Sequence, residues 1–141
     1  MRVERCYRLK VVLSVGKRKS AIAKVVIKPG KGRVLVNEMP IELHPVELFR
    51  NKIVEVLKLL GKDHREQVDI IASVNGGGFM AQADATRTAI ARGLVKYFES
   101  ERLKTIFQEY DRVLLAGDPR RTEPEKYMRY SARRRWQKSY R

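Results

Sequence analysis

Charge is distributed unevenly along this chain of 141 residues, and the distribution limits what the chain can fold into. Residues 1–33 contain eleven Lys and Arg and one acid, a net charge of +10. Residues 34–116 contain eleven basic and twelve acidic side chains, a net charge of −1, and residues 117–141 contain nine and three, a net charge of +6. Folded surfaces usually mix both signs, so this segregation predicts a nearly neutral module flanked by two basic contact surfaces.

The net charge of +15 predicts a polyanionic partner, because a chain so basic repels itself unless its charge is neutralised. A basic protein without such a partner is the alternative. The basic groups lie in turns and a tail, with no recognition helix for reading duplex DNA, which favours irregular folded RNA. A DNA-compacting architectural protein remains a second alternative, and it would bind duplex DNA and RNA equally at matched salt.

The C-terminal segment 117–141 shows no periodicity and has few aliphatic residues, so it cannot bury enough to fold alone. We expect an extended basic tail that could span roughly 80–90 Å. Aromatic side chains lie among its cations and could stack on exposed bases: Tyr127, Tyr130, Trp136 and Tyr140.

Hydrophobic patterning predicts a domain over residues 9–116. Runs rich in β-branched residues predict strands at 9–15, 21–28, 33–37 and 67–75. The sequence "PGKG" (29–32) predicts a hairpin turn between the second and third of these, and "GKRKS" (16–20) a basic turn between the first and second.

Apolar spacings of three and four predict helices over 45–61, 79–100 and 101–110, with Asn51 as a candidate break in the first. A stripe of Ala81, Ala85 and Ala89 would let another element approach the second helix closely. The three glycines before that helix predict a structural turn, or amides that could receive an RNA phosphate. Strands followed by helices give an α+β two-layer sandwich, a sheet backed by helices.

No constellation for catalysis or metal binding is present in the sequence. His44, His64 and the single cysteine, Cys6, are not at ligand spacings, so we expect no enzyme, no cofactor and no metal site. An RNA-modifying or RNA-cleaving enzyme is the alternative, but no general base is suitably placed. One cysteine fits a reducing intracellular compartment, and neither a membrane span nor a signal peptide is expected.

Several stretches resemble a known family. They are "GKRKSAIAKVVIKPGKGRVLVN" (16–37), "VNGGGFMAQADATRTAIARGL" (74–94) and "DPRRTEPEKY" with "ARRRWQKSYR" (118–127 and 132–141). The match is to the universal small-subunit ribosomal protein S-nine family, whose eukaryotic member is S-sixteen, and the "QKSYR" ending resembles its archaeal and eukaryotic branch. The family usually has glycines where Met128 and Ser131 stand here, which weighs against a tight backbone turn in this tail.

The resemblance implies a fold like domain two of ribosomal protein S-five and a cytoplasmic location in the small ribosomal subunit. It implies binding to the 3′ major domain of a 16S-type rRNA in the subunit head, beside neighbouring ribosomal proteins and away from any membrane. The tail would reach the anticodon stem-loop of P-site tRNA. Residues 1–8 would be a flexible extension, 9–116 the rRNA-binding domain and 117–141 the tail.

The residues expected to bind RNA combine this resemblance with the basic turns and strands. The tRNA-binding group is the tip of the tail, namely Lys138, Ser139, Tyr140 and Arg141. The rRNA-binding group comprises Lys17, Arg18, Lys19, Lys24, Lys28, Lys31, Arg120, Arg121, Lys126, Arg129, Arg133, Arg134 and Arg135.

Overall fold

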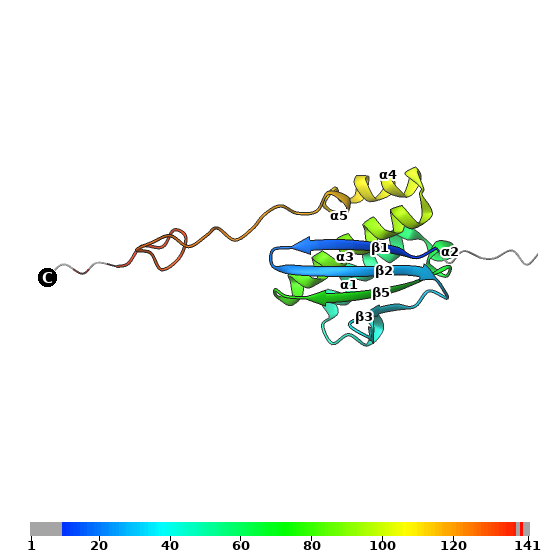
Figure 1. Ribbon diagram of the computed structural model, residues 1–141, viewed down its shortest axis with the longest axis horizontal. Helices are drawn as coiled ribbons and strands as arrows, with labels where there is room; N and C mark the ends of the chain where they lie inside the picture. Colours follow the sequence, from blue (N-terminus) through cyan, green and yellow to red (C-terminus); the bar gives the residue numbers. More distant parts are fainter. Residues whose placement is uncertain (1–9, 138, 140–141) are drawn as a thin grey trace, which may run out of the picture.

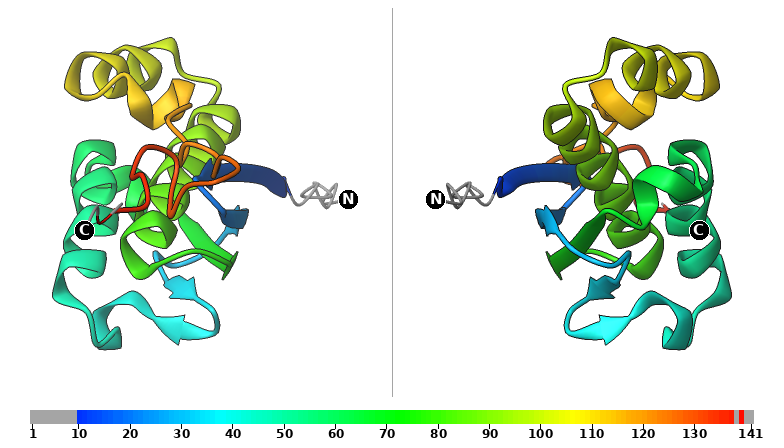
Figure 2. Two further views of the ribbon diagram at one scale, coloured as in Figure 1. Left: turned by 90° about the vertical axis from the view of Figure 1, so that its left-hand side faces the viewer. Right: turned by 90° about the vertical axis from the view of Figure 1, so that its right-hand side faces the viewer.

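The computed structural model describes residues 10–137 and residue 139. A five-stranded sheet forms one layer, and helices cover one of its faces (Figures 1 and 2). The tail leaves this body in an extended course (Figure 1). The expected N-terminal extension 1–8 lies outside the described residues. The elements are β1 (Val12–Arg18), β2 (Ala21–Pro29), β3 (Val34–Val36), β4 (Met39–Pro40), η1 (Ile41–Leu43), α1 (Glu47–Leu60), α2 (Lys62–Arg65), β5 (Val68–Asn75), α3 (Phe79–Phe98), α4 (Glu101–Tyr110) and α5 (Val113–Ala116).

The sheet order is β1-β2-β5-β3-β4, which confirms the α+β class and the layered arrangement. β1 and β2 form an antiparallel hairpin, and β2 also pairs antiparallel with β5. β3 runs parallel to β5 and pairs antiparallel with β4. The basic turn of the β1–β2 hairpin is tighter than predicted. Lys17 and Arg18 continue β1, and only Lys19 and Ser20 make the turn.

The predicted hairpin between residues 21–28 and 33–37 is wrong, because β5 lies between β2 and β3. Asp69 of β5 holds the loop that connects β2 to β3 by hydrogen bonds. Its carboxylate accepts hydrogen bonds from the backbone amides of Lys31 (2.9 Å) and Arg33 (3.0 Å) and from the Arg33 guanidinium. Burial raises the pKa of Asp69, but the hydrogen bonds from Arg33 and Lys31 outweigh it and leave the pKa below its usual value.

The predicted alternation on β2 is confirmed. Ala23, Val25 and Ile27 are buried in the core, whereas Ile22 and Lys24 are exposed. The core lies between this face of the sheet and helices α1 and α3, with Phe49, Ile53 and other apolar side chains of α1 fully enclosed. Helix α1 is continuous through Asn51, so no break occurs there: its apolar face packs along the whole helix until Gly61, whose φ of +86° ends it.

Helix α3 packs against β1 almost backbone to backbone. A Cβ on Gly16 would lie 2.1 Å from the carbonyl oxygen of Ala85 and 2.7 Å from the amide nitrogen of Ala89. On the next turns, a Cβ on Gly93 would lie 2.7 Å from the side chain of Ile27. The predicted alanine stripe therefore contacts a glycine of the facing strand, and small residues on both sides set the spacing of the layers.

We predict that Gly16→Ala lowers the free energy of unfolding by about 1–3 kcal/mol, because its methyl group would overlap α3 backbone atoms that cannot move independently. The matched control is Gly78→Ala, since a Cβ there has no atom within 4 Å and the backbone φ is −86°. This control should change the free energy by less than about 0.5 kcal/mol. Chemical denaturation measures both variants, and equal effects would contradict the close-packing argument.

Candidate nucleic-acid interface

A cationic hollow of about 620 Å³ lies where the β1–β2 turn, helix α3, helix α5 and the start of the tail meet. Its charged lining is five cations and one acid, and the acid, Asp118, is already paired with arginines. The cations are Lys17, Lys19, Arg92, Arg112 and Arg121. They come from segments far apart in the chain, so the fold concentrates positive charge that the sequence distributes.

Arg92 of α3 links helix α5 to strand β1 at this hollow. Its guanidinium donates to the carbonyl oxygens of Leu115 (2.7 Å) and Ala116 (2.8 Å), the last residues of α5. It also donates to the carbonyl of Val15 in β1 (3.1 Å). Arg92 thus satisfies carbonyls at the end of a short helix and ties that helix to the sheet. With three carbonyls bound, its role is mainly to position the start of the tail.

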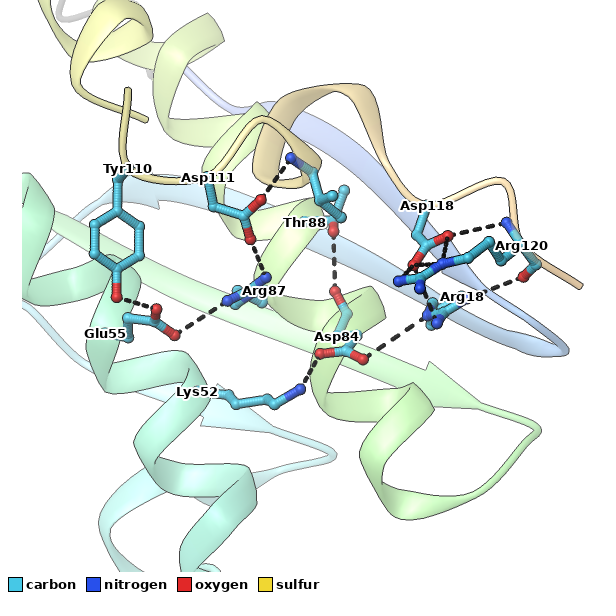
Figure 3. A network of polar contacts seen from close by, with 11 residues as sticks. Arg18, Lys52, Glu55, Asp84, Arg87, Thr88, Tyr110, Asp111, Asp118 and Arg120 are labelled. Atoms are coloured by element: carbon cyan, nitrogen blue, oxygen red, sulfur yellow. Dashed lines mark hydrogen bonds and ion pairs between the residues drawn. The ribbon is translucent and has the colours of Figure 1, made fainter. Parts of the chain in front are cut away.

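The tail is anchored by a second arginine, Arg18, at the end of β1 (Figure 3). Its guanidinium lies 3.0 Å from the carboxylate of Asp118 and donates to the carbonyl of Arg120 at 2.9 Å. The side chains of Arg18 and Asp118 are only 15% and 7% exposed. Hydrogen bonds from Arg120, together with its charge and that of Arg18, hold the pKa of Asp118 far below its usual range.

The same network continues along the helices beneath the hairpin. Asp84 of α3 faces Arg18 at 3.8 Å and pairs with Lys52 of α1. One turn further, Arg87 bridges Glu55 of α1 (3.2 Å) and Asp111 (2.6 Å), as Figure 3 shows. Such networks order several side chains together, so the helices and the start of the tail form one connected unit.

The predicted RNA-binding residues of the hairpin and of the start of the tail fall into two groups, those held by this network and those that line the hollow. Arg18, expected to bind rRNA, is instead largely enclosed by the protein's own acids, Asp84 and Asp118. Lys17, Lys19 and Arg121 line the hollow, and within residues 10–137 and 139 they have no ion-pair partner. Arg120 pairs with Asp118 while most of its side chain stays in solvent.

Other predicted residues lie away from the hollow. Lys24 and Lys28 project from β2, and Lys31 lies in the loop above Asp69. Sequence reasoning missed Arg92 and Arg112 as lining residues. Both belong to the nearly neutral module, where charge counting does not distinguish them, and helix α5 beside Arg112 is too short to show a period.

The tail contains a compact loop that the sequence did not predict. Tyr130 stacks on Trp136 with ring centroids 3.8 Å apart, and Arg129 forms an isolated bridge with Arg135. The expectation of no tight turn near Met128 is wrong: Met128 adopts a φ of +60°, a conformation usually taken by glycine. The aromatic stack and the bridge close the loop and stabilise this strained residue.

Acidic side chains within the tail partly neutralise it. Glu123 binds Lys126 (3.2 Å) and Arg133 (2.8 Å), and the Arg134 guanidinium lies over the Tyr130 ring. Of the expected tRNA-binding tip, Ser139 is described and exposed. The other three residues, Lys138, Tyr140 and Arg141, lie outside the described residues.

The histidines have structural contacts. The ring of His44 stacks on Phe49, and its Nδ1 accepts a hydrogen bond from the amide of Val46. His64 contacts the edge of Phe98. Across the part of the chain that the structure describes, no group of three potential metal ligands comes together, and no helix is long and apolar enough to cross a membrane.

A compact α+β module with a cationic hollow, continued by a basic tail, is the arrangement expected of a protein class that binds polyanions. A model of the family described as ribosomal protein S9/S16 matches residues 16–141. The chain belongs to this family of ribosomal proteins, and membership confirms both the resemblance and the prediction of a non-enzymatic protein.

Three archaeal relatives, each named small ribosomal subunit protein uS9, match the chain almost end to end. The relative from Desulfurococcus amylolyticus is 58% identical, with 95% of each chain aligned. The relative from Aeropyrum pernix is 55% identical over 94% of this chain and 97% of its own. That from Saccharolobus solfataricus is 56% identical over 94% and 96%. These similarities confirm that the chain is an archaeal-type member of the family.

We predict that Arg18→Ala lowers the midpoint of thermal unfolding and releases the start of the tail, because Asp118 loses a partner in a nearly buried position. Limited digestion with a nonspecific protease, followed by mass spectrometry, should cut the parent protein beyond Arg120. The variant should also be cut between Ala116 and Arg120. Lys17→Ala, on the adjacent exposed residue, is the control and should keep the parent pattern. Identical digests for all three proteins would exclude Arg18 as the anchor.

Proposed function

We propose that this protein is a structural component of the small ribosomal subunit, in the cytoplasm, whose globular module binds small-subunit rRNA. The observation that carries the proposal is the hollow at the hairpin end of the sheet. Lys17, Lys19, Arg112 and Arg121 line it, and none has an acidic partner within the described residues. Four free cations around a concavity suit the closely spaced phosphates of a folded RNA backbone.

The anchoring network supports this proposal because it orders the cations before RNA arrives. Arg92 and Arg18 hold helix α5 and the start of the tail against β1. Lys17 of β1 and Arg121 of the tail therefore line one formed hollow. A site that is already ordered loses less conformational entropy on binding than a flexible basic segment does.

We propose that the tail continues from this site along the rRNA of the subunit head, on its 3′ major domain, to the anticodon stem-loop of P-site tRNA. Figure 1 shows the tail directed away from the body, and the loop closed by Tyr130 and Trp136 gives it one ordered feature along the way. The arginines Arg133 to Arg135 would contact rRNA. The tip, Ser139 to Arg141 with Lys138, would contact tRNA, and neighbouring ribosomal proteins complete the surroundings.

The hollow is tested by measuring binding of small-subunit rRNA across a range of salt concentrations. The triple variant Lys17→Ala, Lys19→Ala and Arg121→Ala should weaken binding and reduce the slope of log K against log salt by roughly one unit per lost phosphate contact. The matched control, Lys58→Ala with Lys62→Ala, removes exposed lysines of α1 and α2 outside the hollow and should have little effect.

An unchanged slope in the triple variant would move the rRNA contact to another surface. The same titration with duplex DNA tests the architectural alternative, which would require equal affinity for DNA and rRNA at matched salt. A denatured variant would give a trivial loss of binding, so circular dichroism must first show that the triple variant is folded.

The tail tip is tested by deleting Ser139 to Arg141. On reconstituted subunits this deletion should spare assembly and weaken P-site tRNA binding by on the order of 1–3 kcal/mol, as expected for charge-assisted contacts to phosphate. The loss should be similar for different tRNAs, because phosphates carry no sequence. Replacing Arg133 to Arg135 with Ala should instead impair assembly. Unchanged tRNA affinity and dissociation rate after the deletion would reject a role for the tip.

A further inference from the structure

The second face of the sheet is bare within the described residues, because helices α1 and α3 pack only on the other face (Figures 1 and 2). Aliphatic side chains project from it into solvent, with Leu13 70% exposed, Val15 53% and Ile22 40%. Large aliphatic residues on one strand pair are normally covered, so an exposed group of them marks an interaction site.

The strand register arranges apolar side chains into a row on this face. Leu13 of β1 lies opposite Val26 of β2, Val26 opposite Ile71 of β5, Ile71 opposite Leu35 of β3, and Leu35 opposite Pro40 of β4. The row crosses every strand of the sheet. A continuous ridge of this kind offers a partner a contact along the full width of the fold, unlike single exposed leucines scattered over a surface.

The charges that border this row are positive. Lys24 and Lys28 project from this face of β2. The acid on this face is Asp69, which is only 4% exposed because Lys31 and Arg33 bind it through their amides and the Arg33 guanidinium covers it. Among the described strand residues, the bare face therefore presents aliphatic surface and lysines, with no free carboxylate.

We propose that this face docks an acidic protein segment, one whose aliphatic side chains cover the row while its carboxylates meet Lys24 and Lys28. The cores of protein–protein interfaces are apolar, whereas RNA interfaces are polar and strongly charged, so a row of aliphatic groups favours a protein. The lysines at its border supply charge complementarity, which selects an acidic partner. The proposal rests on membership of a ribosomal subunit, which supplies neighbouring proteins, and does not depend on the rRNA contact at the hollow.

Site-specific photo-crosslinking on assembled small subunits tests the occupant. The full chain carries the photoreactive residue p-benzoylphenylalanine in place of Leu13, or in place of Glu109 on α4 as the control position on the helix layer. We expect position 13 to crosslink to one peptide in which Asp or Glu residues flank aliphatic ones, and position 109 not to reach that peptide. A crosslink from position 13 to RNA, to a basic peptide, or to nothing would overturn the proposal.

A substitution pair separates this face from the hollow. Leu13→Ser should increase the release of the protein from small subunits in a salt wash by about tenfold, the effect of losing one central apolar contact. Its affinity for protein-free rRNA should stay within about twofold of the parent. The control Leu48→Ser removes a similarly exposed leucine from α1 and should change neither quantity. Equal losses of rRNA affinity and subunit retention would assign the face to RNA, and no change in retention would leave it without a partner; either overturns the proposal, while the hollow is judged separately by its salt slope.

Discussion

The close approach of helix α3 to strand β1 determines the geometry of everything that follows it. Gly16 lies against the backbone of α3 at Ala85 and Ala89, so the helix runs at an unusually short distance beneath the hairpin. That distance lets Arg92 of α3 reach the carbonyl of Val15 in β1 and, at the same time, the last carbonyls of α5. It also brings Asp84 beneath Arg18. A larger residue at position 16 would separate the layers and pull these groups apart, so the small residues of the core are a condition for the polar network above it.

The network divides the cations of the module by their contacts. Arg18, Arg87 and Arg92 direct their hydrogen bonds and ion pairs to Asp118, to Glu55 and Asp111, and to backbone carbonyls. Within the middle segment, Glu55 and Asp111 pair with Arg87, and Asp84 pairs with Lys52. Three of the hollow's cations, Lys17, Lys19 and Arg121, come instead from the basic ends of the chain. Four side chains that line the hollow, Lys17, Lys19, Arg112 and Arg121, have no acidic partner within the described residues. Arginine suits the internal role because its planar fork binds several acceptors at once, whereas the lysines at the hairpin present a point charge to solvent.

Sequence reasoning reached the fold class, the main helices, the buried face of β2 and the alanine stripe, because each follows from local periodicity. It failed where a long-range contact determines the strand pairing or the partner of a side chain. The sequence "PGKG" has the composition of a hairpin turn, yet Asp69, more than thirty residues later, binds the amides of that loop and β5 takes the place beside β2. Arg18 looked like its neighbours Lys17 and Lys19 because all three are basic; strand alternation and Asp118, a hundred residues away, make it different. Helix α5 has four residues, too few for a period to be visible.

Met128 is another position where contacts with other residues override the local sequence preference. Its side chain argues against a tight turn, but the stack of Tyr130 on Trp136 and the bridge between Arg129 and Arg135 close a loop that requires a positive φ at this position. A left-handed conformation costs a non-glycine residue about 1 kcal/mol or more, and a stacked aromatic pair contributes a similar amount. The stack of Tyr130 on Trp136 therefore offsets much of the cost of the positive φ at Met128. The tail thus combines a start anchored by the enclosed Arg18–Asp118 pair with a middle loop that its own aromatic stack closes.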